Sequence, residues 1–279
     1  MRILFIGDIV GKPGRKMVTH AMRELRQRES LDLVIANAEN AADGSGINPK
    51  IHRELIDAGV DCITLGDHIY RRSEIYRVLE QETNVVKPAN FPDESPGKPW
   101  SIVEAANGVR VAFFCVLGRV YMRPVDCPFK AIDRVLSKIP NDIKVIFLDI
   151  HAEATSDKQL IGRYVDGRVS AALGTHTHVP TADEQIFPGG TAFQCDVGMT
   201  GPYESILGRK TERVTETTVT FRPTPFQVAT GDVRMSGTIF DVDPKTGKST
   251  SVQRLMVDED EAVDLANSGS SNTVEASTR

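Results

Sequence analysis

The sequence lacks any apolar run that approaches the about 20 residues of a membrane-spanning helix. Its N-terminal run, MRILFIGD, meets a charge at position eight. A secretory signal peptide has a longer apolar core and a cleavage site of small residues, so none is predicted. The four cysteines (Cys62, Cys115, Cys127 and Cys195) include no CxxC pair. We therefore expect no cysteine-based zinc site, and we interpret these residues as the reduced thiols of a cytoplasmic protein.

An excess of positive charge is also absent. The 33 Lys and Arg residues are outnumbered by 38 Asp and Glu residues, which gives a formal net charge of −5. A protein with that balance repels phosphate backbones and anionic membranes, so we expect neither a stable nucleic-acid complex nor membrane association. The 279 residues are 40% hydrophobic and 25% charged. This composition is typical of a globular protein that buries a large core.

Segments of strand type alternate with helical ones through the first two thirds of the chain. Short apolar runs bounded by Gly, Asn or Asp are typical of strands buried on both faces. They occur at residues 2–7, 31–37, 62–65, 109–117, 144–150 and 169–173. Between them, helices are predicted from Pro13, from Asn48-Pro49, and over residues 73–80 and 129–139. Asn107-Gly108 predicts a hairpin turn before residues 109–117.

The pattern changes after Gly190. Residues 214–222, 226–230, 234–242 and 251–257 alternate in polarity and are rich in Thr and Val, which predicts antiparallel strands. An α/β first part followed by a β-rich part can form two sheets packed face to face with helices outside. We therefore expect one domain over residues 1–257. Residues 258–279 are acidic and then rich in Ser, Asn and Thr, and this composition predicts a disordered tail.

The polar residues that stand out all come directly after a predicted strand. They are carboxylate, amide and imidazole side chains: Asp8, Glu39, Asn40, Asp67, His68, His151, His176 and His178. In open α/β sheets, ligands bind in the crevice at the carboxyl ends of the strands. Five separate segments are therefore predicted to deliver these groups to one edge. His20 and His52 lie inside predicted helices, and we interpret them as ordinary surface or core residues.

The segment GTHTH at 174–178 is the most specific of these signals. Two histidines at i and i+2 beyond a strand can reach two different metal ions from one short loop. Their mixture with carboxylate and amide oxygens suits Mn, Fe or Zn better than Ca or Mg. Two such ions, about 3.5–4 Å apart, can share a carboxylate and a bridging hydroxide that attacks a phosphate ester. His68, which follows Asp67 at a strand end, is the best candidate to protonate the leaving alkoxide.

Together these blocks resemble the calcineurin-like metallophosphoesterases. GD at 7–8, NAEN at 37–40, GDH at 66–68, His151 and GTHTH follow the order of that superfamily's motifs. The sequence is most similar to the YmdB-like bacterial phosphodiesterases. That similarity is carried by GDIVGKPGR at 7–15, NAENAADGSGI at 37–47, HAEATSDK at 151–158, GTHTHVPTADEQI at 174–186 and CDVGMTGPYESILG at 195–208. It extends from Met1 to about Leu255, and only the tail falls outside it.

The resemblance implies a four-layer αββα sandwich with a di-metal centre, often of iron or manganese. It also implies hydrolysis of phosphodiesters, with 3′,5′- or 2′,3′-cyclic nucleotides as substrates. In the implied ligand set, Asp8 and His178 bind one metal, His151, His176 and Asp67 bind the other, and Glu39 bridges them. Asn40 then lies in or beside the ligand shell and orients the phosphate, and His68 is the proton donor.

One block departs from the family pattern, because GDH stands where GNH is usual. Asp67 adds a negative charge that should hold cations more tightly, raise the pKa of the bridging water and repel the incoming phosphate. We therefore expect a functional but retuned site.

Two alternatives stay open at this point: a regulatory or scaffolding protein that keeps the fold for partner binding, and a phosphomonoesterase. A homo-oligomer is compatible with the sequence. Arg15, Arg71 and Arg72 could hold a substrate phosphate, although surface arginines are most often solvated.

Overall fold

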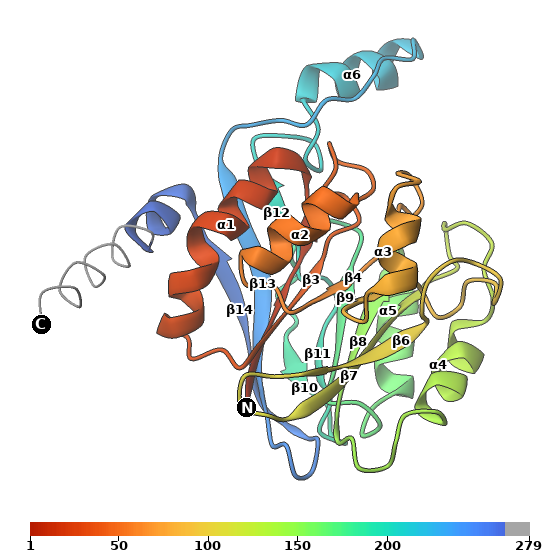
Figure 1. The fold of residues 1–279 in the computed structure, drawn as a ribbon. Helices are drawn as coiled ribbons and strands as arrows, with labels where there is room; N and C mark the ends of the chain where they lie inside the picture. The colour runs from red at the N-terminus through yellow and green to blue at the C-terminus, as the bar shows by residue number, and fades with distance from the viewer. Residues whose placement is uncertain (266–279) are drawn as a thin grey trace, which may run out of the picture.

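Two β-sheets packed face to face form the centre of the structure, a computed structural model that describes residues 1–265 (Figure 1). Helices cover the outer face of each sheet. On the first sheet lie α1 (Gly11–Arg28), α2 (Pro49–Asp57) and α3 (Ile75–Gln81), and on the second lie α4 (Pro128–Leu136) and α5 (Thr155–Tyr164). The layers therefore follow the order αββα, and the predicted fold class is confirmed.

The first sheet is mixed. Its strands are β1 (Arg2–Ile6), β2 (Asp8–Ile9), β3 (Leu33–Asn37), β4 (Cys62–Thr64), β5 (Val85–Val86), β12 (Met199–Pro202), β13 (Val233–Val242) and β14 (Ser249–Val257). Their order is β2-β12-β13-β1-β3-β4-β5, and β14 also pairs with β13. β1, β3, β4 and β5 are parallel neighbours, whereas β13 runs antiparallel to β1. The parallel strands β1, β3 and β4 therefore end at the same edge of the sheet.

The second sheet has the same arrangement at its centre. Its strands are β6 (Trp100–Glu104), β7 (Arg110–Leu117), β8 (Val145–His151), β9 (Ala171–Thr175), β10 (Gln185–Ile186) and β11 (Ala192–Gln194). Their order is β10-β11-β9-β8-β7-β6, with β7, β8 and β9 parallel. β6 and β7 form the hairpin that Asn107-Gly108 predicts, and Gly108 takes a positive φ of 79° in the turn. β8 and β9 thus deliver their last residues to one edge as well.

An aromatic core holds the two sheets together. The ring centroids of Phe5 on β1 and Phe147 on β8 lie 4.7 Å apart. Phe147 also stacks on Phe240 of β13, with a centroid distance of 6.1 Å and an interplanar angle of 15°. All three side chains have no exposed surface. Because β1 leads to Asp8 and β8 ends at His151, the contact between Phe5 and Phe147 joins the two site-bearing strands across the sheets.

The predicted helices of the first half are confirmed, although their bounds differ by a few residues. The helix predicted from Asn48-Pro49 shows the expected cap, because the Asn48 side chain accepts a hydrogen bond from the Ile51 N–H at 3.0 Å. α5 was not predicted. Its buried positions are few and include Lys158 and Gly162, so the segment shows no clear apolar stripe and continues the polar run that follows β8.

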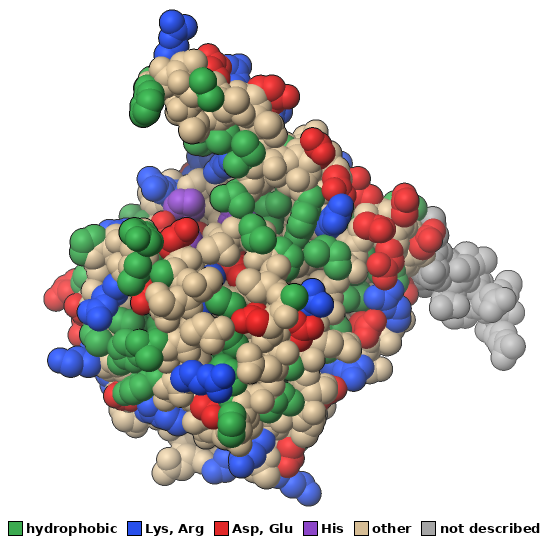
Figure 2. Space-filling view, turned by 180° about the vertical axis from the view of Figure 1, so that it is seen from behind, with side chains coloured by type: hydrophobic (Ala, Val, Ile, Leu, Met, Phe, Trp, Pro, Cys, Tyr) green, Lys and Arg blue, Asp and Glu red, His purple; other side chains and the backbone are tan. Residues whose placement is uncertain are grey.

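The predicted strand at 214–222 is wrong. Its residues form most of α6 (Thr211–Thr220), which projects from the body with no buried residue (Figures 1 and 2). The alternation of Thr and Val did not indicate a strand there, because the segment packs neither of its faces against the rest of the protein. The predicted strand at 226–230 is also absent, apart from a single bridge between Val228 and Arg209. The strands expected at 234–242 and 251–257 are confirmed as β13 and β14.

The start of the predicted disordered tail is helical instead. Residues 259–265 form a helical segment, and Ala262 and Leu265 are buried against the core beside α1. The acidic composition misled the prediction, because two apolar side chains suffice to seat one short helical face. The remainder of the predicted tail lies outside the described residues. Within residues 1–265, no helix combines the length and the apolar character that a membrane crossing requires.

Truncation of the aromatic core should destabilise the whole fold. We expect Phe147→Ala to lower the free energy of unfolding by about 3–5 kcal/mol, because it leaves a cavity between the sheets. Urea denaturation followed by circular dichroism measures this change. Val219→Ala on α6, where the side chain is 74% exposed, is the control and should change stability by less than about 0.5 kcal/mol. Equal stability of the two variants would contradict the role given to Phe147.

Candidate active site

The carboxyl ends of five strands bring all eight candidate residues to one edge of the molecule. Asp8 comes after β1, the pair Glu39 and Asn40 follows β3, the pair Asp67 and His68 follows β4, His151 ends β8, and His176 and His178 follow β9. Three of these segments belong to the first sheet and two to the second. The site is therefore built across the junction of the sheets, and neither sheet could form it alone.

Four of these side chains form a group that could hold a metal ion. The potential ligand atoms of Glu39, Asp67, His151 and His176 all lie within 4.8 Å of one another. His151 Nε2 is 3.2 Å from Glu39 Oε1 and 3.2 Å from Asp67 Oδ1. His176 Nδ1 is 3.5 Å from Asp67 Oδ1. Two imidazole nitrogens with two carboxylate oxygens make a donor set that suits divalent transition metals.

A second group lies beside the first, and Glu39 is next to both. His178 Nε2 is 3.6 Å from Asp8 Oδ1. Asn40 Nδ2 lies 3.3 Å from His178 Nε2, 3.5 Å from Asp8 Oδ1 and 3.4 Å from Glu39 Oε1. Glu39 therefore contacts both groups, as a shared ligand would. Asn40 presents its nitrogen to these acceptors, so it could serve as an oxygen ligand only with its amide turned over.

His68 is held by two hydrogen bonds at the rim of the site. Its backbone N–H donates to Glu39 Oε2 at 2.8 Å, and its Nδ1 lies 2.7 Å from Asn40 Oδ1. Because an amide oxygen only accepts, Nδ1 carries the hydrogen in this contact. Nε2 then remains for a proton that can be exchanged with a bound molecule. The side chain is 28% exposed, so a ligand can reach it.

The electrostatics of the site favour positive charge at its centre. Burial on its own raises the pKa of Asp8 and Asp67, but contacts with His178 and His151 respectively lower both below the ordinary value. Burial on its own lowers the pKa of His151, yet the neighbouring Glu39 and Asp67 carboxylates raise it well above the ordinary value. The carboxylates thus stabilise protons on the imidazoles. The same field would attract metal cations.

A layer of buried polar residues beneath His151 was not predicted. Thr175 Oγ1 donates to Asp149 Oδ1 at 2.6 Å, so its oxygen is left to accept from His151 Nδ1 at 2.8 Å. Thr64 Oγ1 and Asn37 Nδ2 donate to Asp149 Oδ2 at 2.6 and 3.1 Å. These hydrogen bonds place the hydrogen of His151 on Nδ1 and leave Nε2 free to bind a metal. Burial raises the pKa of the central Asp149 carboxyl to about 6.

One sequence signal could have revealed this layer. Alternate residues of a strand point to the same face, and Asp149 lies two positions before His151 in β8. Asn37 lies two positions before Glu39 at the end of β3. Glu153, which was also missed, places Oε2 3.1 Å from His176 Nε2. It lies in the HAE segment directly after β8.

The loop that carries the two histidines after β9 has an unusual backbone. His176 and His178 have φ values of 94° and 64°. Thr177, between them, donates from its backbone N–H and from Oγ1 to Asp196 Oδ2, at 3.1 and 2.7 Å. Asp196 is in turn paired with the buried Lys158 at 2.6 Å. This buried ion pair pins the centre of the loop, so the imidazoles on either side point into the site.

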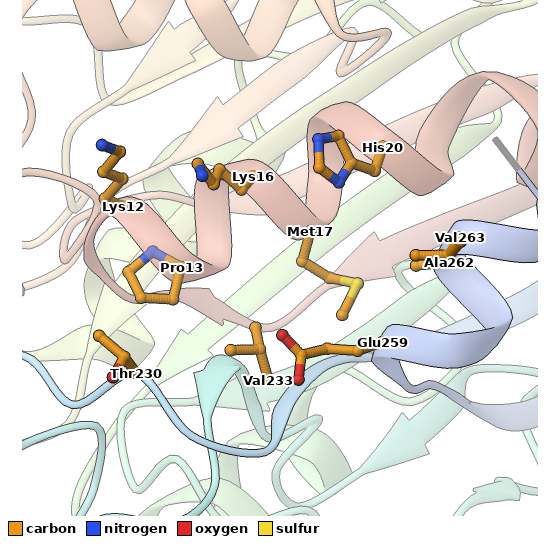
Figure 3. A pocket seen from close by; sticks show the side chains of 10 residues that line it. All are labelled: Lys12, Pro13, Lys16, Met17, His20, Thr230, Val233, Glu259, Ala262 and Val263. Atoms are coloured by element: carbon orange, nitrogen blue, oxygen red, sulfur yellow. The ribbon is translucent and has the colours of Figure 1, made fainter.

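The other residues considered from the sequence lie elsewhere. His52 Nε2 contacts Asn84 Oδ1 at 3.1 Å. His20 is exposed on α1 and lines a larger cavity of about 470 Å³ between α1 and residues 259–265 (Figure 3). None of the residues that line this cavity belongs to the group of Glu39, Asp67, His151 and His176 that could hold a metal ion. Arg15 pairs with Glu54 at 3.1 Å. None of Arg15, Arg71 and Arg72 lines the cavity that contains the site histidines.

Comparison with known families decides the relationship of the chain. A family model described as YmdB-like protein matches residues 4–255, a range that contains all eight candidate residues. The chain belongs to the YmdB-like family. Over 260 residues, this YmdB-like chain is 44% identical to a 2′,3′-cyclic-nucleotide 2′-phosphodiesterase of Bacillus subtilis (strain 168), with 93% of this chain and 98% of the relative covered. It is 31% identical over 274 residues to a putative phosphatase/phosphodiesterase of Mycoplasma genitalium, with 96% of each covered.

Solved structures give the same relationship. The YmdB-like chain matches the crystal structure of a hypothetical protein from Thermus thermophilus with a TM-score of 0.86 and 42% identity, over 93% of this chain and 100% of that one. It matches a novel phosphatase from Mycoplasma pneumoniae with a TM-score of 0.86 and 30% identity, over 92% and 93% of the two chains. The overall fold is therefore shared with experimentally determined structures.

The hydrogen-bond chain beneath His151 should matter for metal affinity. We expect Thr175→Val to weaken Mn²⁺ binding about 10- to 100-fold, because it removes the acceptor that orients the His151 ring. Isothermal titration of metal-free protein with Mn²⁺ measures the change. Thr175→Ser keeps the hydroxyl and should restore affinity, and Thr218→Val on the exposed face of α6 is the matched control. Unchanged affinity in Thr175→Val would refute the orienting role.

Proposed function

We propose that this chain is a metal-dependent phosphodiesterase that hydrolyses cyclic nucleotides. The observation that carries the proposal is the meeting of eight ligand-type and proton-donor side chains from five strand ends at one edge. The identity of 44% to a 2′,3′-cyclic-nucleotide 2′-phosphodiesterase makes 2′,3′-cyclic nucleotides the first substrates to test, ahead of 3′,5′-cyclic ones. The intact set of side chains argues against a scaffold that has lost its chemistry.

Two divalent transition-metal ions fit the donors. Glu39, Asp67, His151 and His176 would hold one, and Asp8 and His178 would hold the other with Glu39 shared. Iron or manganese is the first choice for this mixture of nitrogen and oxygen ligands, and zinc also suits it. Such ions neutralise phosphoryl oxygens and lower the pKa of bound water.

The chain's own residues orient the substrate and move the proton. Asn40 Oδ1 holds the Nδ1–H of His68, so the His68 Nε2 is the atom that would carry the proton to the leaving alkoxide. Asn40 itself reaches both the second group and His68, which suits a residue that contacts the phosphate. The site lies in a cavity of about 260 Å³. That volume is slightly below the about 300–1,000 Å³ of small-molecule pockets, a size that suits a small substrate such as a mononucleotide.

Removal of one metal-ligand candidate should abolish activity. We expect Glu39→Ala and His178→Ala to lower the hydrolysis of bis-p-nitrophenyl phosphate and of 2′,3′-cyclic AMP about 100-fold or more, because a ligand is lost from the cation site. Steady-state assays with Mn²⁺ or Fe²⁺ present, together with elemental analysis, measure both effects. His20→Ala, which removes an exposed imidazole from α1, should leave both unchanged. Full activity in either site variant would remove the basis of the proposal.

A phosphomonoesterase is the second candidate. It is favoured by the word phosphatase in the names of the Mycoplasma genitalium relative and of the Mycoplasma pneumoniae structure. The two activities separate in a panel that pairs 2′,3′-cyclic AMP with 3′-AMP and 2′-AMP, assayed on one preparation of the wild-type protein. A higher kcat/KM for the cyclic diester supports the phosphodiesterase. A higher kcat/KM for the monoesters would show that the protein is a phosphomonoesterase instead.

We expect the Asp67 carboxylate to influence metal affinity and the pH optimum, and not to be essential for hydrolysis. Asp67 lies 3.2 Å from His151 and 3.5 Å from His176. We expect Asp67→Asn to retain hydrolysis, to bind Mn²⁺ more weakly, and to shift the pH optimum downward, because a negative charge beside the cations is removed. The pH profile of kcat and a Mn²⁺ titration measure these changes. If rate, pH optimum and metal content all stayed the same, our interpretation of Asp67 would be wrong.

A further inference from the structure

One cation lines the cavity that contains the candidate site. Its walls include Glu39, Asn40, His68, His176 and His178, together with Glu153. Arg209 is the one Lys or Arg among the described residues that line it. It comes from the segment between β12 and α6. The arginines considered from the sequence, by contrast, lie outside this cavity.

Arg209 is held in place by backbone carbonyls of a site-bearing loop. Its Nη1 donates to the Asp43 carbonyl oxygen at 2.9 Å, and its Nη2 donates to the Gly44 carbonyl oxygen. These carbonyls belong to the loop that begins with Glu39 and Asn40. Gly44 has a φ of 80°, and a Cβ at that position would meet the guanidinium. The glycine therefore leaves the space that Arg209 occupies.

The backbone of Arg209 is fixed as well. It forms bridges with Ile206 and with Val228, and its N–H donates to the Ile206 carbonyl oxygen at 3.0 Å. Arg209 is thus held at its backbone by its own segment, and at its guanidinium by the loop after β3. A side chain that is ordered before a ligand arrives loses little conformational entropy on binding.

The charge of Arg209 is only partly compensated by the described residues. No carboxylate forms an ion pair with it anywhere in residues 1–265. Burial lowers its pKa, and the nearby negative charge of Asp43 offsets this effect only in part. A guanidinium has five N–H donors, and only two of them have acceptors among the described residues. Donors therefore remain for a bound anion.

We propose that Arg209 binds a non-bridging oxygen of the substrate phosphate and so sets the affinity of the site for phosphate esters. This inference rests on the proposed function, since it concerns the same cavity. Glu39 and Glu153 line the same cavity, so a fixed cation there would reduce the repulsion that an anionic ester meets on entering it. A planar guanidinium recognises phosphate oxygens by charge-assisted hydrogen bonds.

The test compares Arg209→Gln and Arg209→Lys with the full-length, Mn²⁺-loaded wild-type protein. Arg209→Gln should raise the KM for 2′,3′-cyclic AMP about 10- to 100-fold, and weaken the binding of inorganic phosphate by a similar factor, because a charge-assisted hydrogen bond is lost. kcat should change far less. Arg209→Lys keeps the positive charge but loses the two-pronged guanidinium. Its KM and its phosphate affinity should lie between those of the wild type and Arg209→Gln. Arg222→Gln, an exposed arginine beyond α6, is the control and should match the wild type.

Several outcomes would overturn the inference while the proposed function stands. One is an unchanged KM and an unchanged phosphate affinity in Arg209→Gln. Another is a parallel loss of kcat, Mn²⁺ content and thermal stability, which would make Arg209 a tether for the loop and not a substrate ligand. A wild-type protein that hydrolyses no phosphate ester refutes the proposed function instead. Isothermal titration with inorganic phosphate still decides the role of Arg209 in that case, and an absence of phosphate binding by the wild type would refute it.

Discussion

Repulsion among buried carboxylates is the constraint around which the site is organised. Asp8 and Glu39 are almost fully buried, and Asp67 lies beside them. Like charges in such a place are tolerated only when positive charge lies between them. The histidines supply it when protonated, and metal cations would supply more. The aromatic core between the sheets, the Asp149 layer and the Lys158–Asp196 pair all hold these groups at contact distance against that repulsion.

The position of the site could be predicted from the sequence because of a property of parallel strands. Polar side chains after β1, β3 and β4 must share one edge of the first sheet, because these strands are parallel. Those at the ends of β8 and β9 share one edge of the second sheet for the same reason, and the packing of the two sheets brings the edges together. The strands themselves were recognisable as short apolar runs, since both of their faces are buried. The hairpin at Asn107-Gly108 and the cap at Asn48 depend on local chemistry alone. Sequence reasoning succeeded where the determining interactions are local or are imposed by strand direction.

It failed where the outcome depends on whether segments distant in the sequence come into contact. Arg209 reaches the Asp43 carbonyl across 166 positions of sequence, and no pattern near either residue records this contact. Thr175 looked like part of the GTHTH motif, whereas its role depends on Asp149 of a neighbouring strand. α6 was mistaken for a strand because its alternation meets no partner surface. The three failures share one cause, since what each segment does depends on whether a distant segment meets it.

The backbone conformation of the loop that carries His176 and His178 lowers the stability of the fold. Positive φ values at His176 and His178 are conformations that glycine adopts freely and that other residues adopt at a cost of about 1–3 kcal/mol each. A chain with glycine at both positions would have a more relaxed backbone there and would carry no imidazoles. This short stretch therefore gives up fold stability to keep its chemistry, and the packed sheets on either side supply the stability that offsets the loss.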